Sequence, residues 1–207
     1  MASAVIHLAV AKELEKDLNI KYKKDYYLGA IAPDLAKQIG ETKDKSHFII
    51  NSPQDIPNIN LFVNKYKKFK KNDFELGYFI HLYTDKLWYE DFIPNIESNN
   101  SIKLLDGTIM QTTPDQITHM IYSDYTNINI DLIENHNLDL SLFYEEFKKP
   151  KTKIDEIPID KLNILINKMG IIIENSKRER TYTFDTYVVE KFINNTIIKI
   201  KEELKKY

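Results

Sequence analysis

The chain has 207 residues, of which 43% are hydrophobic and 29% are charged, and its formal net charge is −2. This composition is typical of a globular protein with its own core and excludes an intrinsically disordered chain. The balanced charge gives no electrostatic reason to expect nucleic acid as the main ligand. Because Lys and Arg alternate with Asp and Glu, we expect solvated faces rather than a phosphate-binding stripe.

The chain contains no cysteine, which excludes disulfides and thiolate metal sites. Any metal must therefore bind to His, carboxylate, water or backbone oxygen, which favours zinc, manganese, iron or magnesium. Residues 1–18 carry charges where a signal peptide needs an apolar core, and no apolar run reaches the roughly 18 residues of a membrane span. We expect a cytoplasmic protein without a transmembrane segment.

Apolar residues recur along most of the chain at the spacing of amphipathic helices. The strongest segment is 73–89, which is apolar nearly all round and has Asp73 as its expected N-cap, so it is predicted to be a central, buried helix. Ser3 is the expected cap of the first helix, and Pro114 suits the first turn of another. The predicted helices cover residues 3–18, 26–32, 59–69, 73–89, 114–125, 139–147, 159–174 and 184–205.

Proline and glycine mark the expected interruptions. Pro33 is expected to end the second helix, because proline disfavours helical geometry at the residue before it, Ala32. Residues 40–56 are expected to form a loop. An Asp-Gly step between two apolar pairs predicts a β-hairpin within residues 102–111.

The segment 148–158, rich in lysine and proline, is the only candidate domain boundary. The part of the chain that follows it is too short to form a convincing independent domain. We therefore expect a single domain over residues 1–207. The expected fold class is an all-α, multi-helix bundle with room for one short β-hairpin.

Of the five histidines, three lie within the first 85 residues. His81 and Asp85 are four residues apart on the predicted central helix, so both side chains lie on one face and can reach one cation. A buried carboxylate is costly unless it is paired or metal-bound. Taken alone, however, this pair is better explained by a structural His–Asp hydrogen bond.

Each of the other three candidates also has a purely structural explanation when it is taken alone; these candidates are His7, Asp34 and His47. They are, respectively, a core histidine on an apolar helix, a turn or cap residue after a proline, and a loop histidine. Together with His81 and Asp85, they supply the nitrogen and oxygen ligands expected of a hydrolytic metal site. The five residues therefore predict a metal site.

The sequence around these residues resembles the zinc-dependent phospholipase C family, most strongly over residues 1–90. The resemblance rests on four stretches: Ala4-Val5-Ile6-His7-Leu8, Tyr27-Leu28-Gly29-Ala30-Ile31-Ala32-Pro33-Asp34, Ser46-His47-Phe48 and Gly77-Tyr78-Phe79-Ile80-His81-Leu82-Tyr83-Thr84-Asp85. It implies the all-α fold shared with single-strand-specific zinc nucleases. It also implies hydrolysis of a phosphodiester or phospholipid substrate, with metal-activated water attacking phosphorus.

By this resemblance, Asp34, His47, His81 and Asp85 would bind one zinc ion. Asp85 would bridge to a second ion bound by His7, so one or two zinc ions are expected, and manganese or iron would accept the same ligands. Asp34 would also be the catalytic residue that accepts a proton from the attacking water.

Secreted members of the family build a third metal site in which a His is followed four residues later by a Glu. No such pair follows Asp85 here. Asp124 is the carboxylate expected to replace it, with a structural helix or turn residue as an equal alternative. His119 is a further candidate, although a solvent-facing helix position is the favoured explanation for it.

Three other functions use the same types of residue. A phosphohydrolase of the HD kind is disfavoured, because no His is followed directly by Asp. A non-catalytic protein that uses the metal as a structural staple stays open, as does a nucleotide or nucleic-acid phosphohydrolase on the same site. The last of these needs a stacking surface and basic lining, and the balanced charge argues against it. The sequence does not indicate an oligomeric state.

Overall fold

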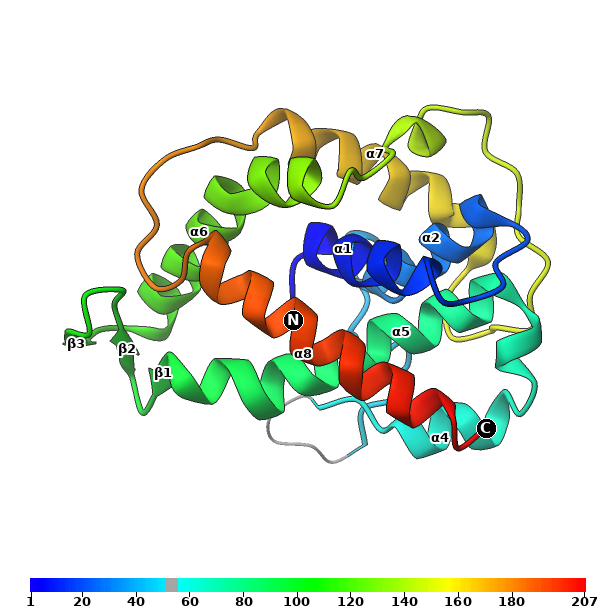
Figure 1. Cartoon of the computed structure of the whole chain (residues 1–207), viewed down its shortest axis with the longest axis horizontal. Coiled ribbons are helices and arrows are strands. Elements are labelled where there is room, and N and C mark those ends of the chain that lie inside the picture. Colours follow the sequence, from blue (N-terminus) through cyan, green and yellow to red (C-terminus); the bar gives the residue numbers. More distant parts are fainter. Residues whose placement is uncertain (51–55) are drawn as a thin grey trace.

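The computed structural model describes residues 1–50 and 56–207, so Pro53, part of the expected loop, lies outside the described residues. The fold is mostly α-helical, which confirms the expected class (Figure 1). Helix α1 packs against all four of the other main helices, so it shares the centre with the segment predicted to be central. The main helices are α1 (Ala4–Glu15), α2 (Lys23–Ile31), α5 (Asp73–Leu87), α6 (Pro114–Asn135) and α8 (Thr186–Leu204).

Other elements connect and cover these helices. Among the described residues, three of them are α-helical: the short α3 (Leu35–Gln38) and α4 (Ile59–Lys65), and the longer α7 (Leu162–Glu174). Five are single 3₁₀ turns: η1 (Ala32–Asp34), η2 (Phe69–Lys71), η4 (Ile93–Asn95), η5 (Ser141–Phe143) and η6 (Ile159–Lys161). One turn, η3 (Trp88–Phe92), has π-helical hydrogen bonding and continues α5.

The helix starts follow from local capping. Ser3 caps α1 as predicted, because its hydroxyl accepts from the Ile6 N–H at 3.3 Å. The cap of α5 is Asn72, not Asp73 as predicted: the Asn72 side chain accepts from the Glu75 N–H at 3.1 Å. The Asp73 carboxylate instead accepts backbone N–H groups from the loop before α2.

The α-helix ends before Pro33 as expected, at Ile31, but the non-helical geometry expected at Ala32 is wrong. Ala32 has helical dihedral angles of −57° and −37°, and the chain passes from α2 through η1 directly into α3. Pro33 is tolerated because it lies in the first turn of η1, where backbone N–H groups have no partner within the helix. Asp34 is therefore held rigidly at the end of α2 rather than on a free turn.

A small antiparallel sheet includes the predicted hairpin. Its strands are β1 (Glu97–Ser98), β2 (Ser101–Lys103) and β3 (Ile109–Gln111), in that order. Gly107 in the β2–β3 turn has a φ of +87°, as an Asp-Gly turn requires. Strand β1 was not predicted. It is joined to β2 by a two-residue turn, Asn99 and Asn100, both with positive φ.

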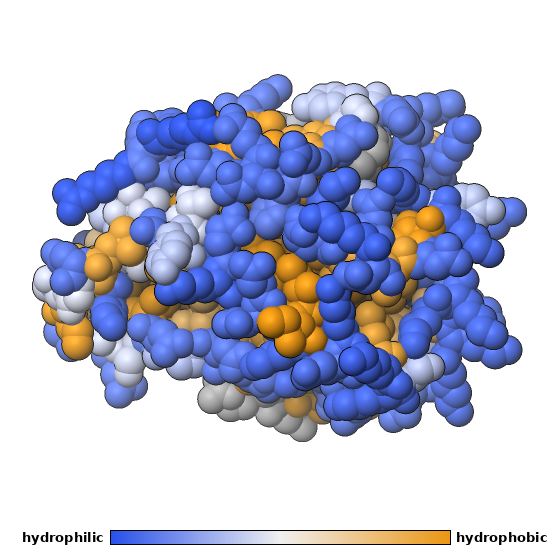
Figure 2. Space-filling view, viewed as in Figure 1, coloured by the Kyte–Doolittle hydropathy of each residue, from blue (hydrophilic) through white to orange (hydrophobic). Residues whose placement is uncertain are grey.

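The second half differs from prediction mainly in helix length. Helix α6 continues well past the expected end at Tyr125, and the short helix expected over 139–147 is only the turn η5. Helices α7 and α8 agree with the predicted segments 159–174 and 184–205. Among the described residues, no helix is both long and apolar enough to cross a membrane. The face seen in Figure 2 is mostly hydrophilic, and hydrophobic residues appear on it in separate small groups.

Two glycines allow α2 and α5 to cross at very short distance. A Cβ atom on Gly77 would collide with the backbone carbonyl oxygen of Tyr26, and one on Gly29 would collide with that of Phe74. Only glycine fits at either position. The crossing brings the last turn of α2, and Asp34 after it, against the middle of α5, where His81 lies one turn beyond Gly77.

Candidate metal centre

The five predicted ligands converge from four parts of the fold. His7 lies on α1, Asp34 on η1, His47 in the loop after α3, and His81 and Asp85 on α5. The side chain of Asp34 is 14% exposed, whereas the other four are at most 2% exposed. Asp34 is therefore the member of the cluster that solvent reaches.

Asp85 lies between the imidazoles. Its Oδ1 is 3.3 Å from His7 Nε2, and its Oδ2 is 3.4 Å from Nε2 of both His47 and His81. Oδ1 also accepts the Ala2 N–H at 2.9 Å, which fixes the orientation of the carboxylate. One carboxylate thus faces different imidazoles with its two oxygens, the arrangement that a bridging ligand requires.

The imidazoles are oriented by groups outside the cluster. His81 Nδ1 is 2.8 Å from the Ala30 carbonyl oxygen, which only accepts, so Nδ1 carries the hydrogen. His47 Nδ1 is 2.9 Å from the Ser46 hydroxyl, whose own hydrogen is donated to the Lys43 carbonyl at 3.2 Å. In the neutral rings both Nε2 atoms are then unprotonated, and they face each other at 3.2 Å. Contacts of this kind orient metal-binding histidines.

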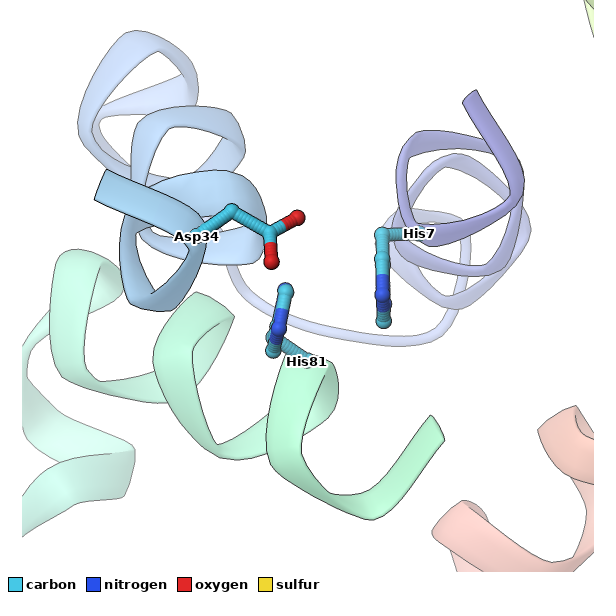
Figure 3. Close-up of side chains that lie close together, drawn as sticks. All are labelled: His7, Asp34 and His81. Carbon is cyan, nitrogen blue, oxygen red and sulfur yellow. The ribbon is translucent and has the colours of Figure 1, made fainter. Parts of the chain in front are cut away.

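His7 lies flat against His81, with the ring centroids 3.8 Å apart and the planes 13° from parallel. Figure 3 shows the two rings, from α1 and α5, with the Asp34 carboxylate pointing toward the space beside them. Ligand atoms of His7, Asp34 and His81 all lie within 4.8 Å of one another, and so do those of His47, His81 and Asp85. The two groups share His81.

Several of these buried atoms lack a hydrogen-bond partner. They are both ring nitrogens of His7, Oδ1 of Asp34 and Oδ2 of Asp85. Unpaired buried polar atoms are costly and rare in folded proteins. A cation placed among them would satisfy the lone pairs of these carboxylates and imidazoles together. The donor set, three histidines and two carboxylates, therefore fits a zinc-type ion.

The directions of the pKa shifts in the cluster also favour a bound cation. Burial lowers the pKa of His7 and His47, which favours the neutral imidazole that binds metal. Burial opposes the ionised form of Asp85, but the imidazoles of His7, His47 and His81 outweigh it and hold its pKa well below the ordinary value. Burial also lowers the pKa of His81, yet Asp85 more than offsets this and the net direction is upward. The Asp85 charge thus attracts a cation, whether a proton or a metal.

Comparison with known proteins gives a family match over the first half of the chain. Residues 5–95 match the family model described as Zinc dependent phospholipase C. The matched segment contains all five residues of the cluster, and the match confirms the resemblance seen in the sequence. No curated protein and no solved structure matches the chain. The phospholipase C match ends before α6, so the candidates for a third metal position must be judged from the structure.

Asp124 lies in the middle of α6, is fully buried and belongs to neither group of candidate ligands. Its carboxylate accepts the N–H groups of Tyr182 and Thr183 at 2.7 Å, the Thr183 hydroxyl at 2.6 Å and the Phe184 N–H at 3.2 Å. These contacts give Asp124 a structural role, the alternative that the sequence left open. His119 is exposed on α6 and belongs to neither group of candidate ligands.

Replacing Asp124 by asparagine is expected to destabilise the protein without changing its zinc content. The amide would turn an N–H donor toward backbone N–H groups that now donate to a carboxylate oxygen, at a cost of about 2–3 kcal/mol. Urea unfolding would measure the loss, and elemental analysis would measure the zinc. A fall in zinc per folded chain would instead make Asp124 a ligand.

A cleft of about 420 Å³ opens beside the cluster. Met1 lines this cleft. The next residue along the chain, Ala2, donates its backbone N–H to Asp85, so Met1 and Ala2 connect the wall of the cleft to the cluster. The Met1 carbonyl accepts from the Tyr125 hydroxyl at 2.8 Å. The cleft wall also carries Lys37 and Lys43, whose ammonium groups donate to tyrosine hydroxyls at 2.7 and 3.2 Å.

Sequence reasoning found the five cluster residues but missed the groups that orient them. The Ala30 carbonyl and the Ala2 N–H carry no side-chain signal, so no motif could reveal them. Ser46 was visible beside His47, and a hydroxyl next to a metal-binding histidine is a usable signal. Lys37 and Lys43 follow Asp34 closely, but only the fold places them at the cleft.

Proposed function

We propose that this protein is a metal-dependent phosphodiester hydrolase of the phospholipase C type. The observation that supports this most directly is the convergence of three imidazoles and two carboxylates, among which buried atoms of His7, Asp34 and Asp85 lack hydrogen-bond partners. The match of residues 5–95 to the zinc-dependent phospholipase C family supports the same reaction class. The substrate class is a phosphodiester, with a phospholipid as the family suggests.

The centre would bind one or two zinc ions. His47, His81, Asp34 and Asp85 would ligate one ion, and His7 with the other oxygen of Asp85 would ligate a second. A zinc ion at such a site neutralises negative charge on phosphoryl oxygens and lowers the pKa of bound water.

Asp34 is the proposed proton acceptor. Its side chain is the most exposed of the cluster, and its buried Oδ1 has no hydrogen-bond partner. A water molecule that reaches the cluster from solvent therefore meets this carboxylate first. Asp34 would accept the proton as the water attacks phosphorus, and it would orient the water for that attack.

The cleft provides a place for the rest of the substrate. Its tyrosines offer ring faces and hydroxyls, and Lys37 and Lys43 offer positive charge close to the centre. The wall also carries Glu41 and Glu97, so the lysines would pair with individual anionic groups of a substrate rather than give the cleft an overall positive charge. This lining favours hydrolysis over a purely structural metal, because a structural site needs no adjoining cleft and has all its positions filled by protein.

The test is zinc content combined with hydrolysis. We expect one to two zinc ions per chain in protein purified without chelator, and zinc-dependent release of a phosphomonoester from a phosphodiester substrate or a phospholipid vesicle. His47→Ala should lose both, whereas His119→Ala, a matched change on the surface of α6, should lose neither. Zinc bound at full stoichiometry with no hydrolysis of either substrate would make the centre a structural staple.

A further inference from the structure

Two lysine-rich segments that are distant in the sequence lie side by side at the start of α5. One is residues 66–71, after α4, and the other is residues 148–153 (Figure 1). The Asn72 side chain donates to the Lys151 carbonyl at 2.7 Å. Glu75 Oε1 accepts the Thr152 hydroxyl at 3.1 Å and the Lys153 N–H at 3.0 Å. The second segment is therefore fastened to the helix that carries the metal ligands.

These segments form a surface that we call the lysine face. Each of its lysines is exposed, and among the described residues none forms an ion pair with a carboxylate, unlike the neighbouring Lys65, which pairs with Asp155 and Glu156. The expected alternation of opposite charges does not hold at this surface. The lysine face consists of Lys67, Lys68, Lys71, Lys148, Lys149, Lys151 and Lys153.

Two hollows lie on the lysine face. One, of about 600 Å³, is lined by six lysines and a single acid, Glu75, which is 5% exposed and already accepts two hydrogen bonds. The other, of about 780 Å³, shares Lys71 and Lys151 with the first but is also lined by three aspartates. The excess of positive charge is therefore greatest over the first hollow.

We propose that the lysine face binds the anionic surface of a lipid bilayer. A chain with a net charge of −2 is not attracted to such a surface as a whole, but seven unpaired lysines at one end provide a local attraction. Long lysine side chains on a fixed backbone can place their ammonium groups among lipid phosphates and carboxylates while their stems stay against the protein. This inference concerns binding and stands independently of the proposed hydrolysis.

The lining favours lipid over nucleic acid. The lysine face contains no arginine, the residue that recognises phosphate with two parallel hydrogen bonds. The aromatic residue in the first hollow, Tyr66, is 5% exposed and donates its hydroxyl to Glu156, so it offers no surface for base stacking. Tyr22, which is 68% exposed, lines the second hollow, where a tyrosine suits the headgroup level of a bilayer.

The test is sedimentation of the zinc-loaded protein with vesicles. We expect binding to phosphatidylcholine vesicles that contain about one-third phosphatidylserine, weak binding to phosphatidylcholine alone, and loss of binding as salt is raised. Replacing Lys68, Lys149 and Lys151 together by glutamine should weaken binding by more than about tenfold. All three side chains are exposed, so the variant should unfold at the same urea concentration as the native chain.

A matched control variant separates the effect of the lysine face on vesicle binding from the effect of the total charge of the protein. Lys103→Gln, Lys177→Gln and Lys191→Gln remove the same charge from exposed positions on β2, after α7 and on α8. This control should bind the vesicles as the native chain does. Equal losses in both variants, no binding of the native chain to anionic vesicles, or tighter binding to a single-stranded oligonucleotide at the same salt would each overturn the proposal.

Discussion

Asparagine in place of Asp85 is expected to abolish zinc binding while leaving the fold intact. The side chain keeps its shape, and its oxygen can still accept the Ala2 N–H that now donates to Oδ1. Its amide group would take the place of Oδ2, 3.4 Å from the Nε2 atoms of His47 and His81, and could donate to their lone pairs. The negative charge that attracts the cation would be gone. We expect zinc affinity to fall by more than about a hundredfold and hydrolysis to fall to background.

The effect of Asp85→Asn on zinc binding can also be measured from the free energy of unfolding with and without chelator. Zinc that binds only the folded native chain should add about 4 kcal/mol to its free energy of unfolding when zinc exceeds its dissociation constant a thousandfold. A chelator should remove this increment from the native chain and change nothing in Asp85→Asn. Asp160→Asn, an exposed aspartate on η6, serves as the control and should respond to chelator as the native chain does. Equal chelator responses in the Asp85 and Asp160 variants would contradict a metal centre at Asp85.

The cluster could be predicted from the sequence because its chemistry lies in side chains within short, patterned stretches. His81 and Asp85 share a helix face at a spacing fixed by helix geometry, so their proximity follows from local structure. The convergence of His7, Asp34 and His47 on that pair does not follow from any local rule. It was predicted from the combined set of nitrogen and oxygen ligands and from the resemblance of the surrounding stretches to a known family, and the structure then supplied the distances.

The errors arose where backbone contacts decide the outcome. Asn72 and Asp73 are both good caps, and only the extended backbone at Asn72 together with the loop before α2 determines which one is used. Pro33 ends the α-helix as expected, but the chain continues in a 3₁₀ turn rather than in extended geometry, and this turn places Asp34. The lysine face was missed because two segments far apart in the sequence create it by packing together.

Alanine in place of Gly77 is expected to be among the most destabilising single substitutions in this chain. The added methyl would collide with the Tyr26 carbonyl oxygen and with the Ala30 backbone nitrogen, and helix backbone atoms cannot move aside as a flexible side chain can. Helices α2 and α5 would have to separate, at a cost of more than about 3 kcal/mol. Urea unfolding of the zinc-free protein measures this cost without any contribution from the metal.

The same substitution should also damage the metal centre, because the crossing of α2 and α5 sets the position of Asp34 against His81. The hydrogen bond from His81 Nδ1 to the Ala30 carbonyl, 2.8 Å long, spans that crossing and would lengthen or break. We therefore expect the fraction of Gly77→Ala that still folds to bind less zinc than the native chain. Gly170→Ala, on α7, is the matched control. A methyl there meets no atom within 4 Å, so alanine should stabilise the helix by about 0.5–1 kcal/mol and leave zinc binding unchanged. A Gly77 variant as stable as the Gly170 variant, with full zinc content, would show that the close crossing is not what holds the centre together.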